Sequence, residues 1–176
     1  LGSYRFDVHK TAKDKQEKEL EALTLVEFNE GTLPAVQEGA RIGQIIAEAV
    51  SLAKDLINQP GNYCTPSLLA EVAEQVAAKA DLRFQVLGEK EMAEMGMGAL
   101  LGVAQGSNEP AQFIILEHNA GRDDLPTYVV IGKGITFDSG GLSLKPHEGM
   151  EEMKEDMAGA AAILGVLHAV GTLKIP

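Results

Sequence analysis

The chain has 176 residues, of which 45% are hydrophobic and 23% are charged, a balance typical of a globular domain with a sizeable core. Its formal net charge of -11 and pI near 4.8 argue against non-specific binding of nucleic acid or of an anionic membrane by this segment. We expect no membrane span, because no apolar run approaches the roughly 20 residues required, and no signal peptide.

The single cysteine, Cys64, bears on the setting of the chain. It can form no internal disulfide, which fits a reducing cytoplasm, so we expect a cytoplasmic protein. The sequence starts without methionine and stops at Pro176 just as an apolar stretch begins. We therefore expect the chain to be a piece of a longer protein.

The first 30 residues are predicted to be a connector. Lys10 to Glu21 is mostly charged, which indicates a solvated surface. Residues 23–28 (Leu-Thr-Leu-Val-Glu-Phe) have the composition of a strand, and residues 29–31 form a turn that ends it.

Two amphipathic helices are predicted next. Over residues 34–58 apolar side chains recur every three or four positions, and residues 58–62 (Asn-Gln-Pro-Gly-Asn) end that helix sharply. Thr65 and Pro66 then fit an N-cap and a first helical position, so a second helix begins there and extends to about residue 80. Its predicted inward residues are Leu69, Val72, Ala73, Val76 and Ala77.

The remainder alternates strands with helices. Strands are predicted at 82–87, 102–106, 112–118 and 127–132, and helices at 89–95 and 156–170. This alternation implies an α/β fold with a mixed, mainly parallel sheet flanked by helices, although the last two strands suit an antiparallel pair because their link is short. The unbroken apolar run at 127–132 predicts a strand covered on both faces, and the helix at 156–170, apolar nearly all round, is predicted to be buried.

A glycine-rich loop joins the last predicted strand to the last helix. From Gly132 to Pro146 it holds two lysines, one aspartate and four glycines. Glycine lets the backbone approach a ligand closely, so we expect the loop to be shaped around something bound. Lys133 stands at the carboxyl end of the strand, where ligands of open α/β sheets bind.

Four charged residues, Lys133, Asp138, Lys145 and Asp156, leave two interpretations open. Converging carboxylates repel each other, so they need positive partners or a metal ion. In the first interpretation the lysines pair with the aspartates, and Asp156 caps the last helix. In the second a divalent metal takes the carboxylates and one lysine, whose ammonium group, with an ordinary pKa of about 10.4, must first lose a proton. Patterns of P-loops, dinucleotide-binding loops, zinc proteases and nucleophile elbows do not occur.

The loop and its flanks resemble a known family. Residues 129–146 (Val-Val-Ile-Gly-Lys-Gly-Ile-Thr-Phe-Asp-Ser-Gly-Gly-Leu-Ser-Leu-Lys-Pro) and 149–157 (Gly-Met-Glu-Glu-Met-Lys-Glu-Asp-Met) are similar to the metal-binding region of the leucyl aminopeptidases, the cytosol (M17) aminopeptidase family. Residues 58–66 and 95–103 are also similar to family segments. The resemblance implies that residues 1–30 are the end of an N-terminal domain with its linker. Residues 31–176 would then be the N-terminal part of a truncated metallo-aminopeptidase catalytic domain.

The resemblance also implies a role for individual residues. Lys133 matches a ligand of one metal, Asp138 matches an aspartate that bridges two metals, and Asp156 matches a second ligand of the Lys133 metal. Lys145 matches a catalytic lysine that is no ligand but stabilises charge on the substrate carbonyl oxygen. Met153 matches a residue that lines the pocket for the first side chain of the substrate.

The implied function is hydrolysis of N-terminal residues, with a leucine-like preference, from peptide substrates by two divalent ions, zinc or manganese. The family usually assembles as a homohexamer. Its second ligand cluster, Asn-Thr-Asp-Ala-Glu-Gly-Arg, whose arginine holds a bicarbonate, does not occur in this sequence. We therefore expect the 176-residue chain alone to bind at most one metal ion weakly and to be inactive.

Two alternatives remain. Some bacterial members of the family also bind DNA, so the full-length protein would have a non-enzymatic DNA-binding or regulatory role, although the acidity of this segment counts against it. A pseudo-enzyme would lack the second ligand cluster downstream. The four histidines have no ligand spacing, and Cys64 is interpreted as a packing residue. Lys154 and Glu155 are expected to face solvent or another subunit.

Overall fold

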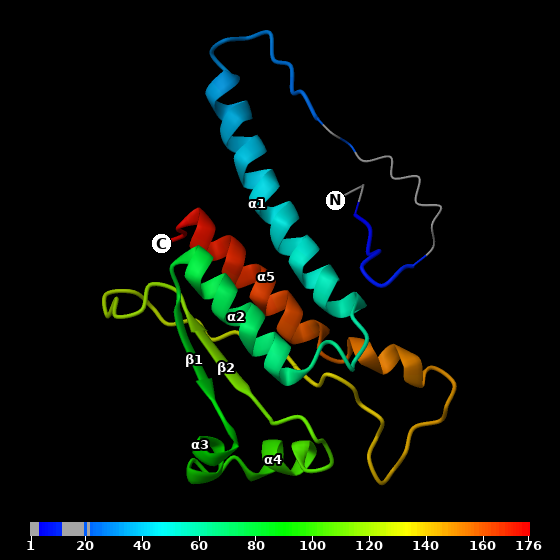
Figure 1. The fold of residues 1–176 in the computed structure, drawn as a ribbon. Helices are drawn as coiled ribbons and strands as arrows, with labels where there is room; N and C mark the ends of the chain where they lie inside the picture. The colour runs from blue at the N-terminus through cyan, green and yellow to red at the C-terminus, as the bar shows by residue number, and fades with distance from the viewer. Residues whose placement is uncertain (1–3, 12–19, 21) are drawn as a thin grey trace.

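The computed structural model describes residues 4–11, 20 and 22–176, so the charged run at 10–21 lies mostly outside the described residues. In chain order the elements are α1 (Leu33–Asn58), α2 (Pro66–Ala80), β1 (Arg83–Leu87), α3 (Glu89–Glu94), α4 (Gly98–Ala104), β2 (Phe113–Glu117), the 3-10 helix η1 (Met150–Glu155) and α5 (Ala158–Leu173). Helix α5 lies between α1 and α2, and the β1–β2 sheet packs beside α2 with α3 and α4 at its far end (Figure 1).

Both long helices predicted from the sequence are confirmed. Helix α1 ends at Asn58, and Thr65 caps α2 by accepting a hydrogen bond at 3.2 Å from the Leu68 N–H. Pro66 occupies the first helical position of α2. Of the predicted inward residues of α2, only Val72 is partly buried rather than buried.

Small residues let the three long helices approach one another closely. A Cβ added to Gly165 of α5 would lie 2.7 Å from the Ala49 carbonyl oxygen of α1, and one added to Gly171 would lie 2.4 Å from the Ala80 oxygen of α2. Only glycine permits such backbone contact. The core between these helices consists of Leu56, Cys64, Leu69, Ala73, Met157, Ala161 and Leu164.

The sheet is smaller than predicted and antiparallel. Strands β1 and β2 confirm the predictions at 82–87 and 112–118, and they pair with Arg83 opposite Glu117. Because this two-stranded sheet is the one sheet among the described residues, the α/β class holds only in the coarse sense, and a mainly parallel arrangement is not observed.

The strand predicted at 102–106 is wrong. Residues 98–104 form α4 instead. Met97, Leu100, Leu101 and Ala104 pack together against the cluster of Leu87, Met92 and Ala111, and their spacing of three and four residues follows the helical period.

The strands predicted at 23–28 and 127–132 also do not form. Both segments are irregular, and their apolar side chains are exposed, with Phe28 at 95% and Ile131 at 89%. A strand needs a hydrogen-bonded neighbour, and no other described residue pairs with either segment. The prediction of a strand buried on both faces at 127–132 is therefore wrong for this chain.

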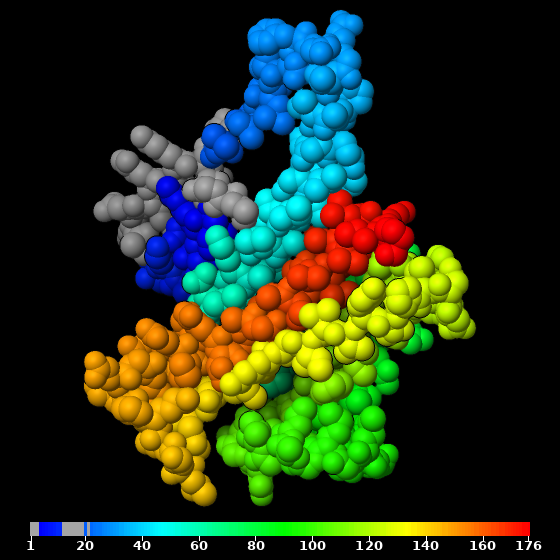
Figure 2. All heavy atoms as spheres, turned by 180° about the vertical axis from the view of Figure 1, so that it is seen from behind, coloured from blue at the N-terminus to red at the C-terminus, as the bar shows by residue number. Residues whose placement is uncertain are grey.

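Helix α5 is apolar as predicted, but it is buried on one side only. Ala161, Leu164 and Gly165 are buried, whereas Val166 is 48% exposed. Figure 2 shows this exposed side of α5 (orange to red). The segment before the glycine-rich loop (yellow) runs along one edge of it.

By length and composition, Met150–Leu173 is apolar enough to cross a membrane, with a mean hydropathy of 1.5 over its best window. The expectation from the sequence was that no segment would meet this criterion. A single helix of this kind is weak evidence for a membrane span, and one face of α5 packs on α1 and α2.

Candidate metal centre

The glycine-rich loop begins against the N-terminal end of α5. A Cβ on Gly132 would lie 2.5 Å from the Gly159 carbonyl oxygen, so glycine is required for this contact. The Ala160 N–H donates a hydrogen bond to the Lys133 oxygen at 2.8 Å. These contacts bring Lys133 to the start of α5, close to Asp156.

Lys133 and Asp156 form an ion pair, with Lys133 Nζ 3.0 Å from Asp156 Oδ2. The Asp156 side chain is 19% exposed, whereas that of Lys133 is 61% exposed. Although the ammonium group is close, the buried Oδ2 atom accepts no hydrogen bond of ordinary geometry from any described residue. This oxygen can therefore still accept a hydrogen bond or bind a cation.

Lys145 and Asp138 form a second ion pair, with Lys145 Nζ 3.2 Å from Asp138 Oδ2. The other carboxylate oxygen accepts a hydrogen bond from the Gly140 N–H at 2.9 Å. Gly140 has φ of +88°, and a Cβ there would lie 2.3 Å from the Ser143 carbonyl oxygen. The Lys145 N–H bonds to the Ser139 oxygen at 2.9 Å, so the tight backbone turn places both charged residues.

The charge of Lys133 also reaches the second ion pair. The Gly140 N–H is the largest cause that holds the pKa of the Asp138 carboxyl below its ordinary value, followed by the hydrogen bond with Lys145. The positive charges of Lys145 and Lys133 act in the same direction. The Lys133 charge therefore acts on Asp138, although Lys133 forms its ion pair with Asp156.

The donor set fits part of a metal centre. Two carboxylates and a lysine amine are oxygen and nitrogen ligands of the kind that manganese and zinc accept. Among the described residues, however, no three His, Cys, Asp or Glu side chains gather closely enough to hold an ion. The ion pairs agree with the first of the two interpretations from sequence, but the helix cap that it assigned to Asp156 is not observed, because the N-cap residue of α5 is Met157 and no side chain caps the helix. The unbonded Asp156 oxygen leaves the second interpretation open as well.

Met153 lies on η1, three residues before Asp156, and is partly buried. Its carbonyl oxygen accepts a hydrogen bond from the Asp156 N–H at 3.3 Å. Its role in lining a substrate pocket stays a prediction.

Lys154 corrects an expectation from the sequence. Its side chain is only 30% exposed, and Nζ donates hydrogen bonds to the carbonyl oxygens of Ile57 at 3.1 Å and Asn58 at 3.4 Å. Lys154 therefore binds α1 instead of facing solvent, whereas Glu155 is exposed, as expected, at 55%. Contact of either residue with another subunit stays a prediction. No local signal points to the bonds with α1, because the acceptors lie on an element almost a hundred positions earlier.

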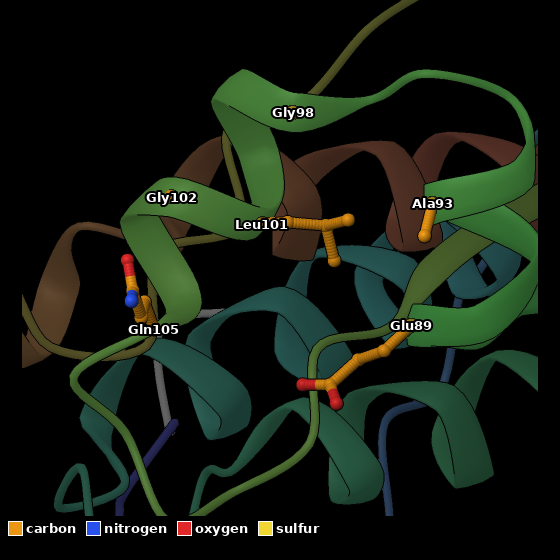
Figure 3. Close-up of a pocket in the computed structure, with 6 residues that line it drawn as sticks. All are labelled: Glu89, Ala93, Gly98, Leu101, Gly102 and Gln105. Carbon is orange, nitrogen blue, oxygen red and sulfur yellow. The ribbon is translucent and has the colours of Figure 1, made fainter.

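A concavity between α3 and α4 lies away from the two ion pairs (Figure 3). It is lined by Glu89, Ala93, Gly98, Leu101, Gly102 and Gln105. Its one carboxylate, Glu89, already accepts a hydrogen bond from the Ala111 N–H at 3.0 Å. None of the predicted site residues lines it, so it is not the candidate metal centre.

Comparison with known proteins agrees with the sequence resemblance. The family model "Cytosol aminopeptidase family, catalytic domain" matches residues 51–176. Curated relatives named "Probable cytosol aminopeptidase" include one from Geotalea uraniireducens, 50% identical over 99% of this chain, and one from Alkaliphilus metalliredigens, 42% identical over 99%.

The chain spans 35% of the length of these two relatives. A solved structure, "Bottromycin maturation enzyme BotP in complex with Mn", is similar with a TM-score of 0.81 and 32% identity, over 99% of this chain and 35% of that one. The matched residues 51–176 include Lys133, Asp138, Lys145 and Asp156. The chain belongs to the cytosol aminopeptidase family.

Proposed function

We propose that the complete protein containing this chain is a metal-dependent aminopeptidase that removes N-terminal residues, with a leucine-like preference, from peptides. The observation that carries the proposal is the two ion pairs Lys133–Asp156 and Lys145–Asp138, in the part of the chain that matches this family. Residues 1–30 would end a preceding domain, and residues 31–176 would open a catalytic α/β domain whose larger sheet is completed by the rest of the protein.

We propose that Lys133, Asp138 and Asp156 are this chain's ligands for two divalent metal ions. These ions would be zinc or manganese. When bound, such ions polarise a carbonyl group and lower the pKa of a bound water molecule. Asp156 Oδ2 is the supporting feature, since it is buried and accepts no hydrogen bond from a described residue. To ligate, Lys133 would leave its ion pair with Asp156 and lose a proton.

Lys145 has a different task in this proposal. Its main chain is fixed by the Ser139 carbonyl oxygen, and its ammonium group lies 3.2 Å from Asp138. With Asp138 engaged as a metal ligand, this ammonium group would be free to donate a hydrogen bond to the substrate carbonyl oxygen. Such donors contribute about 3–4 kcal/mol to the stabilisation of a transition state. Met153 would contact the first side chain of the substrate.

The remaining ligands and the bicarbonate would come from the rest of the protein, with a homohexamer as the assembly and the cytoplasm as the location. The DNA-binding and pseudo-enzyme alternatives gain no support. We expect the 176-residue chain alone to bind at most one metal ion and to hydrolyse nothing. Robust cleavage of leucyl-p-nitroanilide by that chain, purified away from host enzymes, would contradict this expectation.

The test uses the complete protein, stripped of metal and titrated with Mn²⁺ before assay on leucyl-p-nitroanilide. Asp138→Asn and Asp156→Asn should weaken Mn²⁺ binding at least tenfold and abolish cleavage, because each removes a charged ligand. Lys145→Met should retain the metal and lose roughly 100-fold in kcat. Glu152→Gln, an exposed neighbour on η1, is the control and should change neither quantity. Wild-type metal affinity in both aspartate variants would refute the proposed centre.

A further inference from the structure

We propose that Lys154 is a positioning residue, which holds Asp156 in the metal centre by tying η1 to the C-terminal end of α1. This inference rests on the proposed metal centre. Lys154 lies two residues before Asp156, and its Nζ donates to the carbonyl oxygens of Ile57 at 3.1 Å and Asn58 at 3.4 Å. The anchor and the ligand therefore belong to the same short turn.

The end of α1 is a suitable anchor for a cation. The last carbonyl groups of a helix lack partners within the helix and carry its partial negative charge. The last turn of α1 has no basic residue of its own. The Leu56 oxygen accepts the Gln59 N–H, and the Lys54 oxygen accepts the Asn58 side chain. Lys154 donates to the last two carbonyl groups of the helix, those of Ile57 and Asn58.

The position of Asp156 depends on outside contacts, because η1 is weak by itself. It is a six-residue 3-10 helix, has no buried residue and follows Gly149, whose φ is +79°. Lys154 is also 3.9 Å from Glu155, but the Glu155 side chain is 55% exposed, so that pair adds little. Among the described residues, no other hydrogen bond joins η1 to another helix or strand, so the bonds of Lys154 are its polar attachment to α1.

The same end of α1 also supports the other carboxylate. Gly61, in the turn after α1, lies so close to the glycine-rich loop that a Cβ there would be 3.3 Å from the Phe137 side chain and from the Thr136 carbonyl oxygen. Phe137 directly precedes Asp138. The C-terminal end of α1 and the turn after it therefore contact the neighbours of both carboxylates, and Lys154 is the contact on the Asp156 side.

The test compares Lys154→Met and Lys154→Arg in the complete protein. Methionine keeps an apolar stem without donors, whereas arginine keeps donors and charge. We measure the Kd for Mn²⁺ and the hydrogen exchange of residues 150–157 in the metal-free protein. Lys154→Met should weaken Mn²⁺ binding about tenfold, as loss of a group that orients a ligand does, and should speed exchange in η1. Lys154→Arg should restore both.

Lys90→Met, at an exposed lysine of α3, is the matched control and should leave both quantities unchanged. The inference is overturned if Lys154→Met binds Mn²⁺ with wild-type affinity, or if Lys154→Arg is as impaired as Lys154→Met. If Lys154→Met fails to fold, Lys154→Gln keeps an uncharged amide donor group on a shorter stem. It should then show intermediate affinity, and wild-type affinity would equally overturn the inference. If Asp156→Asn also keeps wild-type affinity, the metal centre itself fails, which separates the two proposals.

Discussion

Asp138 is held from two sides, by the Gly140 N–H and by the ammonium group of Lys145. Both contacts favour the charged carboxylate, so its pKa lies below the ordinary value. A carboxyl group whose pKa is lower in the folded state stabilises that state at pH values above its unfolded pKa. The stabilisation is lost as the pH falls through the folded pKa.

This sign gives the first prediction. In the metal-free protein, Asp138→Asn removes the titrating group, so wild type should be the more stable at pH 6. The difference in free energy of unfolding should shrink as the pH falls below about 4, where the carboxyl of the unfolded state takes up its proton, and down through the lower pKa of the folded state. Urea unfolding of both proteins at pH 6 and pH 3 measures it. A difference of the same size at both pH values would contradict the stated contacts.

A glycine pair tests the geometry that presents Asp138. Gly140 and Gly141 both have positive φ, but only Gly140 is crowded, by the Ser143 oxygen. Gly141→Ala should cost about 1 kcal/mol through φ alone. Gly140→Ala should cost at least about 1 kcal/mol more because its Cβ must displace backbone. Thermal unfolding compares the two, and equal losses would show that the turn accommodates a side chain.

At this scale the sequence identified much of the candidate site. Residue chemistry and family resemblance together point to Lys133, Asp138, Lys145 and Asp156, and the structure joins these residues in two ion pairs. Lys154 was not identified, because its acceptor Asn58 lies 96 positions away and nothing local connects them. Contacts between distant segments need the packing of the helices to be known.

Among the elements, helices could be predicted far better than strands. The boundary between α1 and α2 follows from local signals, namely the break after Asn58 and the Thr65-Pro66 start. A strand is stable only when another strand pairs with it. The apolar run at 127–132 has the composition of a strand, but it is irregular here because no described strand lies beside it. The helix at 98–104 was missed because glycines at 98 and 102 obscured its period.

The packing of α5 on α1 gives a prediction for helical glycines. Gly165→Ala should lower the free energy of unfolding by about 1–3 kcal/mol, because its Cβ would overlap the Ala49 carbonyl group. Gly43→Ala, in the exposed part of α1 with nothing within 4 Å, should raise it by about 0.5–1 kcal/mol through helix propensity. Urea unfolding measures both, and destabilisation by Gly43→Ala would contradict the open space around it.

For the whole molecule, the uncovered apolar surface is the most informative feature. Residues 128–131 and the exposed side of α5 place Tyr128, Val129, Val130, Ile131 and Val166 in solvent. Large exposed apolar patches mark interaction surfaces. Since the chain spans 35% of its relatives, we expect a further part of the complete protein to cover this surface and to supply the missing sheet neighbour.

Ile131→Lys tests that expectation. Although Ile131 is 89% exposed here, the substitution should destabilise the complete protein by about 2 kcal/mol or more, because it would bury a charge. Ala120→Lys, in the exposed turn after β2, should be nearly neutral. Thermal unfolding measures the stability of both variants. If Ile131→Lys is as stable as Ala120→Lys, residues 128–131 stay exposed to water in the complete protein.

Cys64 lies in the turn after α1, the same turn whose Gly61 contacts the glycine-rich loop. It is fully buried, packs in the cluster with Met157, and is the one cysteine of the chain. Burial raises the pKa of its thiol, so reagents reach a reactive thiolate only when this region opens. The rate at which the thiol is labelled therefore reports how often this region opens. Because Met157 adjoins Asp156, loading with Mn²⁺ should slow its labelling by a disulfide reagent, without any probe being added to the chain.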